Sequence, residues 1–144
     1  MKLCSALAVS ILLSGCGSAW GTVREAAGAN PSRLPLVKVW LDGQGPFVFT
    51  VDTGSNGCVL RGSVAKKLKL PVGREGTLRG GGGTLQSHRV LIHTVEVAGV
   101  RVDSVPFAMA DLPADLGDGL LGNNFLQAYR VTLDFPRSQV RLDP

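Results

Sequence analysis

The chain has 144 residues, of which 44% are hydrophobic and 19 are glycines, a size that fits one compact domain. The formal net charge is +4, and the basic residues are scattered apart from a cluster at Lys66, Lys67 and Lys69. This charge gives no reason to expect a nucleic-acid partner, and the lysine cluster fits a solvated face or a contact with an anionic membrane surface. Short runs of Val and Leu broken by Gly, Pro and Asp, without a long helical period, predict a mainly β fold.

Residues 1–15 have the pattern of a signal peptide. Lys2 precedes the apolar run Leu3–Leu13, which is too short to span a hydrocarbon core of about 30 Å as a helix. The run closes with Leu-Ser-Gly-Cys, which resembles the lipobox of bacterial lipoproteins. This resemblance implies that Cys16 is lipidated and that the chain is anchored in the bacterial cell envelope, facing the periplasm or the cell exterior. An ordinary secretory signal with a chance cysteine is the alternative.

Residues 16–33 are rich in Gly, Ala and Ser and show no periodicity, which predicts a flexible tether between the lipid and a folded domain over 34–144. Loss of Cys4 with the signal and acylation of Cys16 would leave Cys58 as the one thiol of the domain, so no internal disulfide is expected. The apolar neighbours of Cys58 predict a buried small hydrophobic residue and not a nucleophile.

The residues from Val37 to Leu41 alternate between apolar and polar side chains, which predicts a half-buried strand. Gly43–Pro46 supplies turn residues, and 47–51 is expected to form the returning strand of a hairpin. That strand leads directly into Asp52-Thr53-Gly54-Ser55.

An apolar strand that ends in Asp-Thr-Gly-Ser resembles the active-site loop of aspartic proteases, and the small single-domain form resembles the retropepsin-like (retroviral-type) family. The resemblance implies that Asp52 is the catalytic aspartate, that the Thr53 hydroxyl bonds to an opposite loop, and that Ser55 supports the Asp52 carboxylate. Gly54 would let the backbone pass close to that partner loop, because it has no Cβ. The chemistry requires a water held between two carboxylates that share one proton.

A glycine-rich stretch follows about 25 residues after Asp52, where this family places a hairpin that closes over the substrate as a flap. The stretch completes neither a phosphate-binding loop nor a dinucleotide fingerprint, and a plain surface loop is the alternative. The residues expected to form the flap and bind substrate are Gly80, Gly81, Gly82, Gly83 and Thr84.

The segment Asp118–Gly122 resembles the apolar segment that threads beside the catalytic loop in this family and leads into a short helix. Leu120, Leu121 and Gly122 are therefore expected to support the active site without taking part in the chemistry. Asn123 or Asn124 is expected to cap the helix that follows.

The remaining pattern completes an all-β fold class. The resemblance to the family covers roughly 34–143 and implies a small closed β-barrel-like retropepsin (acid protease) fold with one short helix and one lobe per chain. The further strands are expected over 85–97, 100–110, 129–134 and 139–142, and the helix over 63–68.

A single Asp-Thr-Gly occurs in the 144 residues, and it supplies half of an aspartic protease site. The sequence therefore predicts a homodimer in which each subunit contributes Asp52 and a shared groove binds a polypeptide substrate. Retroviral members dimerise partly through a sheet of chain termini, for which 141–144 is a candidate. The expected function is an aspartic endopeptidase, with a catalytically inactive, membrane-tethered module that binds extended peptides by strand addition as the alternative.

No cofactor and no metal are expected. His88 and His93 are five residues apart and would lie on opposite faces of a regular strand, so they would not share a metal. A serine hydrolase is disfavoured, because Ser55 lacks a Gly-x-Ser-x-Gly elbow.

Overall fold

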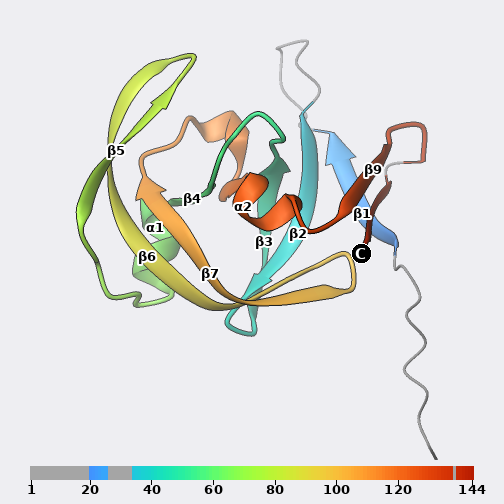
Figure 1. Ribbon diagram of the computed structural model, residues 1–144, viewed down its shortest axis with the longest axis horizontal. Helices are drawn as coiled ribbons and strands as arrows, with labels where there is room; N and C mark the ends of the chain where they lie inside the picture. The colour runs from blue at the N-terminus through green and yellow to red at the C-terminus, as the bar shows by residue number, and fades with distance from the viewer. Residues whose placement is uncertain (1–19, 26–33, 138) are drawn as a thin grey trace, which may run out of the picture.

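A computed structural model of the chain describes residues 20–25, 34–137 and 139–144 (Figure 1). Over these ranges the protein is mainly β, with two short α-helices and one 3₁₀ turn. The strands are β1 (Trp20–Glu25), β2 (Pro35–Leu41), β3 (Gln44–Val51), β4 (Cys58–Arg61), β5 (Glu75–Gly80), β6 (Gly83–Val97), β7 (Val100–Ala110), β8 (Gly119–Leu121), β9 (Arg130–Asp134) and β10 (Gln139–Asp143). The helices are α1 (Gly62–Lys67) and α2 (Asn123–Leu126), and the 3₁₀ turn is η1 (Ala114–Leu116).

The strands form one sheet that closes on itself. Its order is β5-β6-β7-β4-β8-β3-β2-β1-β10-β9, and an additional pairing joins β6 to β2. The strands from β6 to β2 in this order therefore form a closed ring, from which β5 extends at one end and β1, β10 and β9 at the other. The predicted all-β, closed fold class is confirmed.

The core lies inside this ring and follows the alternation in the sequence. On β2, Val37, Val39 and Leu41 are buried, whereas Lys38 and Trp40 face outward. Full burial of each such aliphatic side chain contributes about 1.5–3 kcal/mol. The half-buried strand predicted for this segment is confirmed.

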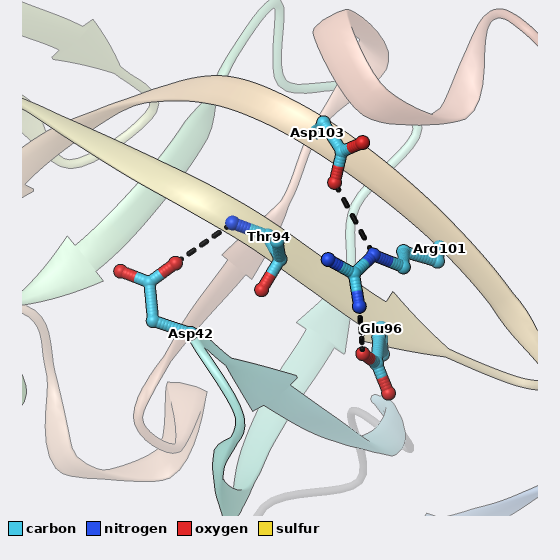
Figure 2. A network of polar contacts seen from close by, with 5 residues as sticks. All are labelled: Asp42, Thr94, Glu96, Arg101 and Asp103. Carbon is cyan, nitrogen blue, oxygen red and sulfur yellow. Dashed lines mark hydrogen bonds and ion pairs between the residues drawn. The ribbon is translucent and has the colours of Figure 1, made fainter.

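The β2–β3 hairpin turns one residue earlier than the sequence predicted. The turn is Asp42-Gly43, with φ values of 48° and 73°, and β3 already begins at Gln44. A two-residue turn with both residues at positive φ matches the twist of a hairpin, so it displaces the expected turn at Gly43–Pro46. Asp42 also attaches this turn to β6: its N–H donates to the Thr94 carbonyl at 2.9 Å, and its carboxylate accepts from the Thr94 N–H at 2.7 Å (Figure 2).

Ionic contacts accompany the turn between β6 and β7. The Arg101 guanidinium donates to Glu96 at 3.2 Å and to Asp103 at 3.3 Å (Figure 2). All three side chains are largely exposed, so solvent screens these pairs and each contributes at most about 1 kcal/mol.

Strand β1 lies within the segment 16–33 that the sequence predicted as a flexible tether. Trp20–Thr22 pair with β10, and 23–25 pair with β2, both antiparallel. These pairings join segments far apart in the chain, and the short stretch has no periodic pattern that would have announced them. The tether prediction is therefore wrong for 20–25. The signal peptide, Cys16 and the rest of the tether lie outside the described residues.

Helix α1 begins and ends one residue before the predicted range of 63–68. Val64 and Ala65 are buried in the core, and the lysines of its last turn are exposed. The Lys67 ammonium lies 5.2 Å from the centroid of the Phe47 ring, within the range of a cation–π contact. In the part of the chain that the structure describes, no helix has both the length and the apolar character needed to cross a bilayer.

Candidate active site

Strand β3 delivers Asp52 to the start of a tight loop. The Asp52 N–H donates to the carbonyl of Leu121 at 3.0 Å, which fixes the loop to the neighbouring strand β8. The Asp52 carbonyl accepts from the Ser55 N–H at 3.2 Å, and a carboxylate oxygen accepts from the Gly54 N–H at 3.0 Å. The loop thus holds the Asp52 side chain in one orientation through its own backbone.

Thr53 and Gly54 form the exposed tip of this loop. A Cβ built on Gly54 would lie 3.2 Å from the Asp52 carboxylate, so a larger residue would crowd that group. The predicted bond from the Thr53 hydroxyl to an opposite loop would require a second subunit and stays a prediction.

Ser55 acts on the loop and not on the carboxylate. Its hydroxyl donates to the carbonyl of Gly57 at 2.8 Å, and no hydrogen bond joins it to the side chain of Asp52. The expected support of the carboxylate by Ser55 is therefore wrong as a direct contact. The hydroxyl stabilises the turn instead, because the Gly57 carbonyl lies within its reach two residues ahead.

The segment predicted to support the site lies beside the loop. Strand β8, which contains Leu120 and Leu121, runs parallel to β3 and antiparallel to β4. Both leucines are buried. At Gly122 a Cβ would lie 2.3 Å from the Gly57 carbonyl oxygen, so the loop and this segment approach more closely than any larger residue allows.

The sequence predicted that Asn123 or Asn124 caps helix α2, and this prediction is wrong. Gly122 occupies the cap position and makes no side-chain bond, and both asparagines lie in the first turn. The Asn123 amide donates to the Thr53 carbonyl at 3.0 Å. The Asn124 amide accepts from the Cys58 N–H at 2.8 Å and donates to the Pro106 carbonyl at 2.8 Å. Because both side chains lie close to other segments, they form hydrogen bonds with distant backbone groups and not with the N-terminus of their own helix.

Arg61 is a structural residue that the sequence did not reveal. Its guanidinium donates to the carbonyls of Leu112 at 2.6 Å, Pro113 at 2.7 Å and Gly117 at 2.6 and 2.9 Å. One charged side chain thus holds the connection between β7 and β8. The one local signal is that Arg61 directly follows the buried residues of β4, where a charge needs partners.

Cys58 is buried, as predicted. Its thiol accepts from the Gly122 N–H at 3.4 Å, and 2% of the residue is exposed. Burial raises the pKa of the Cys58 thiol to about 11, against an ordinary value of 9.0. The thiol is therefore protonated at neutral pH, which fits a packing role and not a nucleophile.

The glycine-rich stretch forms the tip of a hairpin, as the flap prediction required. Residues 75–80 of β5 pair with 83–88 of β6, and we call this paired unit the flap hairpin. It projects from the left of the body in Figure 1. A Cβ on Gly80, Gly81, Gly82 or Gly83 would meet no atom within 4 Å, and Thr84 is exposed. At His88, β6 pairs with both β5 and β7.

A cavity of about 640 Å³ lies between the catalytic loop and the flap hairpin. This active-site cavity is within the range of small-ligand and peptide subsites. The residues that line it are 54–58, 77–79, 89, 106–108 and 124. Asp52 is not among them but adjoins the cavity through Gly54. None of the flap residues named from the sequence lines the cavity. The flap hairpin contributes 77–79 of β5, which lie just before its tip.

No group of three or more His, Cys, Asp or Glu residues that could hold a metal ion occurs in the described ranges 20–25, 34–137 and 139–144. His88 is half-buried and His93 is exposed.

Comparison with known proteins places the chain among proteases. Residues 37–125 match the family model described as aspartyl protease. A retropepsin-like aspartic protease from Rickettsia conorii has a similar structure, with a TM-score of 0.59 and 16% identity over 88% of this chain and 89% of that one. EIAV protease in complex with the inhibitor HBY-793 is similar with a TM-score of 0.54 and 24% identity, over 70% of this chain and 92% of that one. No curated protein matches the chain in sequence.

The sequence identities to the two solved structures are low, so these similarities establish the fold of the chain and nothing more. The family match adds the sequence of the site itself, since it contains Asp52, the flap hairpin and the segment from Leu120 to Asn123. It covers 89 of the 144 residues, so this chain belongs to the aspartyl protease family and has a retropepsin-like fold.

Proposed function

We propose that the chain is an aspartic endopeptidase that acts on polypeptides as a symmetric homodimer. The observation that carries the proposal is the placement of Asp52. Its carboxylate lies in the Asp-Thr-Gly-Ser loop, held by the Gly54 N–H, beside a cavity that the flap hairpin helps to wall.

The dimer supplies the second carboxylate, because the sequence contains a single Asp-Thr-Gly and Thr53-Gly54 are exposed in one chain. Two Asp52 carboxylates about 3 Å apart do not both ionise, so they share one proton. The charged member takes a proton from a water, whose oxygen bonds to the peptide carbonyl carbon, while the other member protonates the carbonyl oxygen. The carboxyl that took the proton of the water then gives a proton to the departing amine as the C–N bond breaks, and a hydroxyl of the tetrahedral intermediate returns a proton to the other carboxylate, so the pair again shares one proton.

Cleavage of a diverse peptide library between acid and neutral pH, by the full chain purified in detergent, tests the proposal. We expect Asp52→Asn to reduce kcat/KM by at least about a thousandfold, because the substitution replaces both carboxylates of the dimer by amides and leaves no general base or acid in the site. Circular dichroism of both proteins controls for folding, and a pepstatin-type inhibitor should block the wild type. Equal activity of wild type and Asp52→Asn would exclude the mechanism.

A membrane-tethered module that binds peptides without hydrolysis is the competing reading of the same fold. It would appear as a folded, dimeric chain that binds peptides equally well with Asp52 or Asn at this position and cleaves none. Retention of an intact catalytic loop supports the protease.

We also propose that Cys16 anchors the protein to the bacterial cell envelope, on the side of the periplasm or the cell exterior. The support is the lipobox-like sequence Leu13–Cys16 after an apolar signal. Cys16→Ser is expected to abolish incorporation of labelled fatty acid and move the protein from the membrane to the soluble fraction. Cys58→Ser serves as the matched control and should stay in the membrane. Fatty-acid labelling that survives Cys16→Ser would rule out this anchor.

A further inference from the structure

Two charged residues line the active-site cavity, and both are arginines. Arg79 and Arg89 line it together with residues 54–58 and apolar residues that include Leu78 and Ala108. No Asp, Glu or Lys is among the described residues that line it. The cavity wall therefore carries positive charge that no side chain within it balances.

The two arginines come from different parts of the site. Arg79 lies on β5, next to the tip of the flap hairpin. Arg89 lies on β6 opposite Ala108 of β7. The Arg89 N–H donates to the Arg74 carbonyl at 2.9 Å, and its carbonyl accepts from the Gly73 N–H at 2.8 Å. The backbone of Arg89 is thus fixed on both edges, whereas Arg79 belongs to the projecting hairpin.

Neither arginine is neutralised within the part of the chain that the structure describes. Three other arginines form ion pairs with neighbouring carboxylates: Arg101, Arg137 and Arg141. Arg79 and Arg89 form none, and Glu75, four residues before Arg79 on β5, pairs with neither. Two guanidinium groups beside an open cavity attract an anion.

We propose that the active-site cavity binds the side chain of an acidic residue, Glu or Asp, of the polypeptide substrate, close to the peptide bond that is cleaved at Asp52. The inference rests on the proposed protease function. A guanidinium donates two parallel hydrogen bonds to one carboxylate, and the half-buried apolar residues Leu78 and Ala108 accommodate the methylene groups of Glu. The cavity volume of about 640 Å³ leaves room for the carboxylate and the methylene groups of such a side chain.

Matched peptides test the site. In each, one position within four residues of the cleaved bond carries Glu, Gln or Lys, and kcat/KM is measured with the full chain in detergent. We expect Glu to be preferred over Gln about threefold to tenfold at one position, the range of a partly exposed charge-assisted pair. The preference should shrink at high salt, which screens the charges.

Charge reversal identifies the residue responsible. Arg89→Glu is expected to invert the preference, so that the Lys peptide is cleaved faster than the Glu peptide. A variant that merely unfolds would lose all cleavage and could not show this inversion. Arg101→Gln, an exposed arginine outside the cavity, is the matched control and should keep the Glu preference. Arg79→Gln should reduce the preference without inverting it.

Binding of the same peptides to Asp52→Asn, measured by fluorescence anisotropy, separates this inference from the proposed function. Cleavage without any Glu preference would overturn the acidic site and leave the protease intact. Tighter binding of the Glu peptide by a protein whose wild type cleaves nothing would support the acidic site and overturn the protease. An unchanged Glu preference in Arg89→Glu would also overturn the assignment.

Discussion

Backbone groups hold Asp52 in place. The side chains that stabilise its loop are ones for which the sequence predicted a different role. Asn123 and Asn124 looked like helix caps, yet their amides bond to Thr53, Cys58 and Pro106. A cap is a local interaction that a sequence can announce, whereas these bonds join residues up to 70 positions apart. The sequence therefore identified the Asp-Thr-Gly-Ser loop, but not the residues that hold this loop in place.

Gly122 leads to a prediction about packing at this loop. Gly122→Ala would place a Cβ 2.3 Å from the carbonyl oxygen of Gly57. The clash is with backbone atoms of Gly57, so it can be relieved only by a shift of the loop or of the segment that contains residue 122. We expect a loss of about 2–3 kcal/mol in the free energy of unfolding, together with loss of cleavage.

Gly57→Ala is the matched control, because a Cβ there would meet no atom within 4 Å. Urea unfolding of the two variants beside the wild type measures the difference. Equal stabilities of the two variants would show that the close approach of Gly57 and Gly122 does not constrain the loop.

Cys58 gives a prediction about pH. Burial raises its pKa from 9.0 to about 11, so its contribution to stability is complete below pH 9 and is lost as pH rises toward 11. Between these values the unfolded chain releases a proton that the folded chain keeps. The loss amounts to about 3 kcal/mol, from 1.36 kcal/mol per pKa unit.

Cys58→Ala removes this titration, so the stability difference between wild type and variant should shrink by that amount from pH 9 to pH 11. Chemical denaturation at several pH values provides the measurement. A difference that stays constant over this range would mean that the thiol titrates normally in the folded protein.

At the scale of elements, the bounds of several strands could be predicted almost to the residue. The bounds expected for β7 agree with the structure, and those expected for β6, β9 and β10 differ by one or two residues. On β9 and β10 polar and apolar residues alternate, whereas β6 and β7 are separated by a turn that contains Gly99. Strand β1 shows the limit of this reasoning, because its place depends on β2 and β10, which the local sequence does not contain.

The connection between β7 and β8 shows the same limit. It is a loop with one 3₁₀ turn, and three of its backbone carbonyls accept hydrogen bonds from the guanidinium of Arg61. Residues such as Pro113 and Gly117 are typical of a loop, but they do not indicate which element holds it. An element of this kind is positioned by a partner about 50 residues away in the chain.

At the scale of the whole molecule, the pairing of β10 bears on how two chains meet. β10 is hydrogen-bonded to β1 on one side and to β9 on the other, and the sheet ends at β5 and β9. The retroviral pattern of a dimer sheet built from chain termini could therefore be extended here at β9. Among the described strands, Arg141 is paired on both sides, whereas 142 and 143 pair with β9 alone, so the end of β10 is a second candidate edge.

Mixing wild type with Asp52→Asn tests the shared site directly. If each active site needs two Asp52 side chains, an equal amount of the variant should reduce the activity of a fixed amount of wild type to about half, because random exchange of subunits forms mixed dimers. A site complete in one chain predicts no change. An equal amount of an unrelated protein controls for dilution, and activity after equilibration of the mixture is the measurement.

The partner change of β6 at His88 has a consequence for how a substrate enters. Residues 83–87 pair with β5 alone, while the residues after His88 pair with β7 and belong to the ring. A movement of the flap hairpin therefore requires a hinge at this junction, because the ring side of β6 is held on its far edge. Arg89 lies on the fixed side of the hinge and Arg79 on the moving side. A carboxylate bound to both would therefore stabilise the closed position of the flap hairpin, so that recognition of the acidic side chain and closure would occur together.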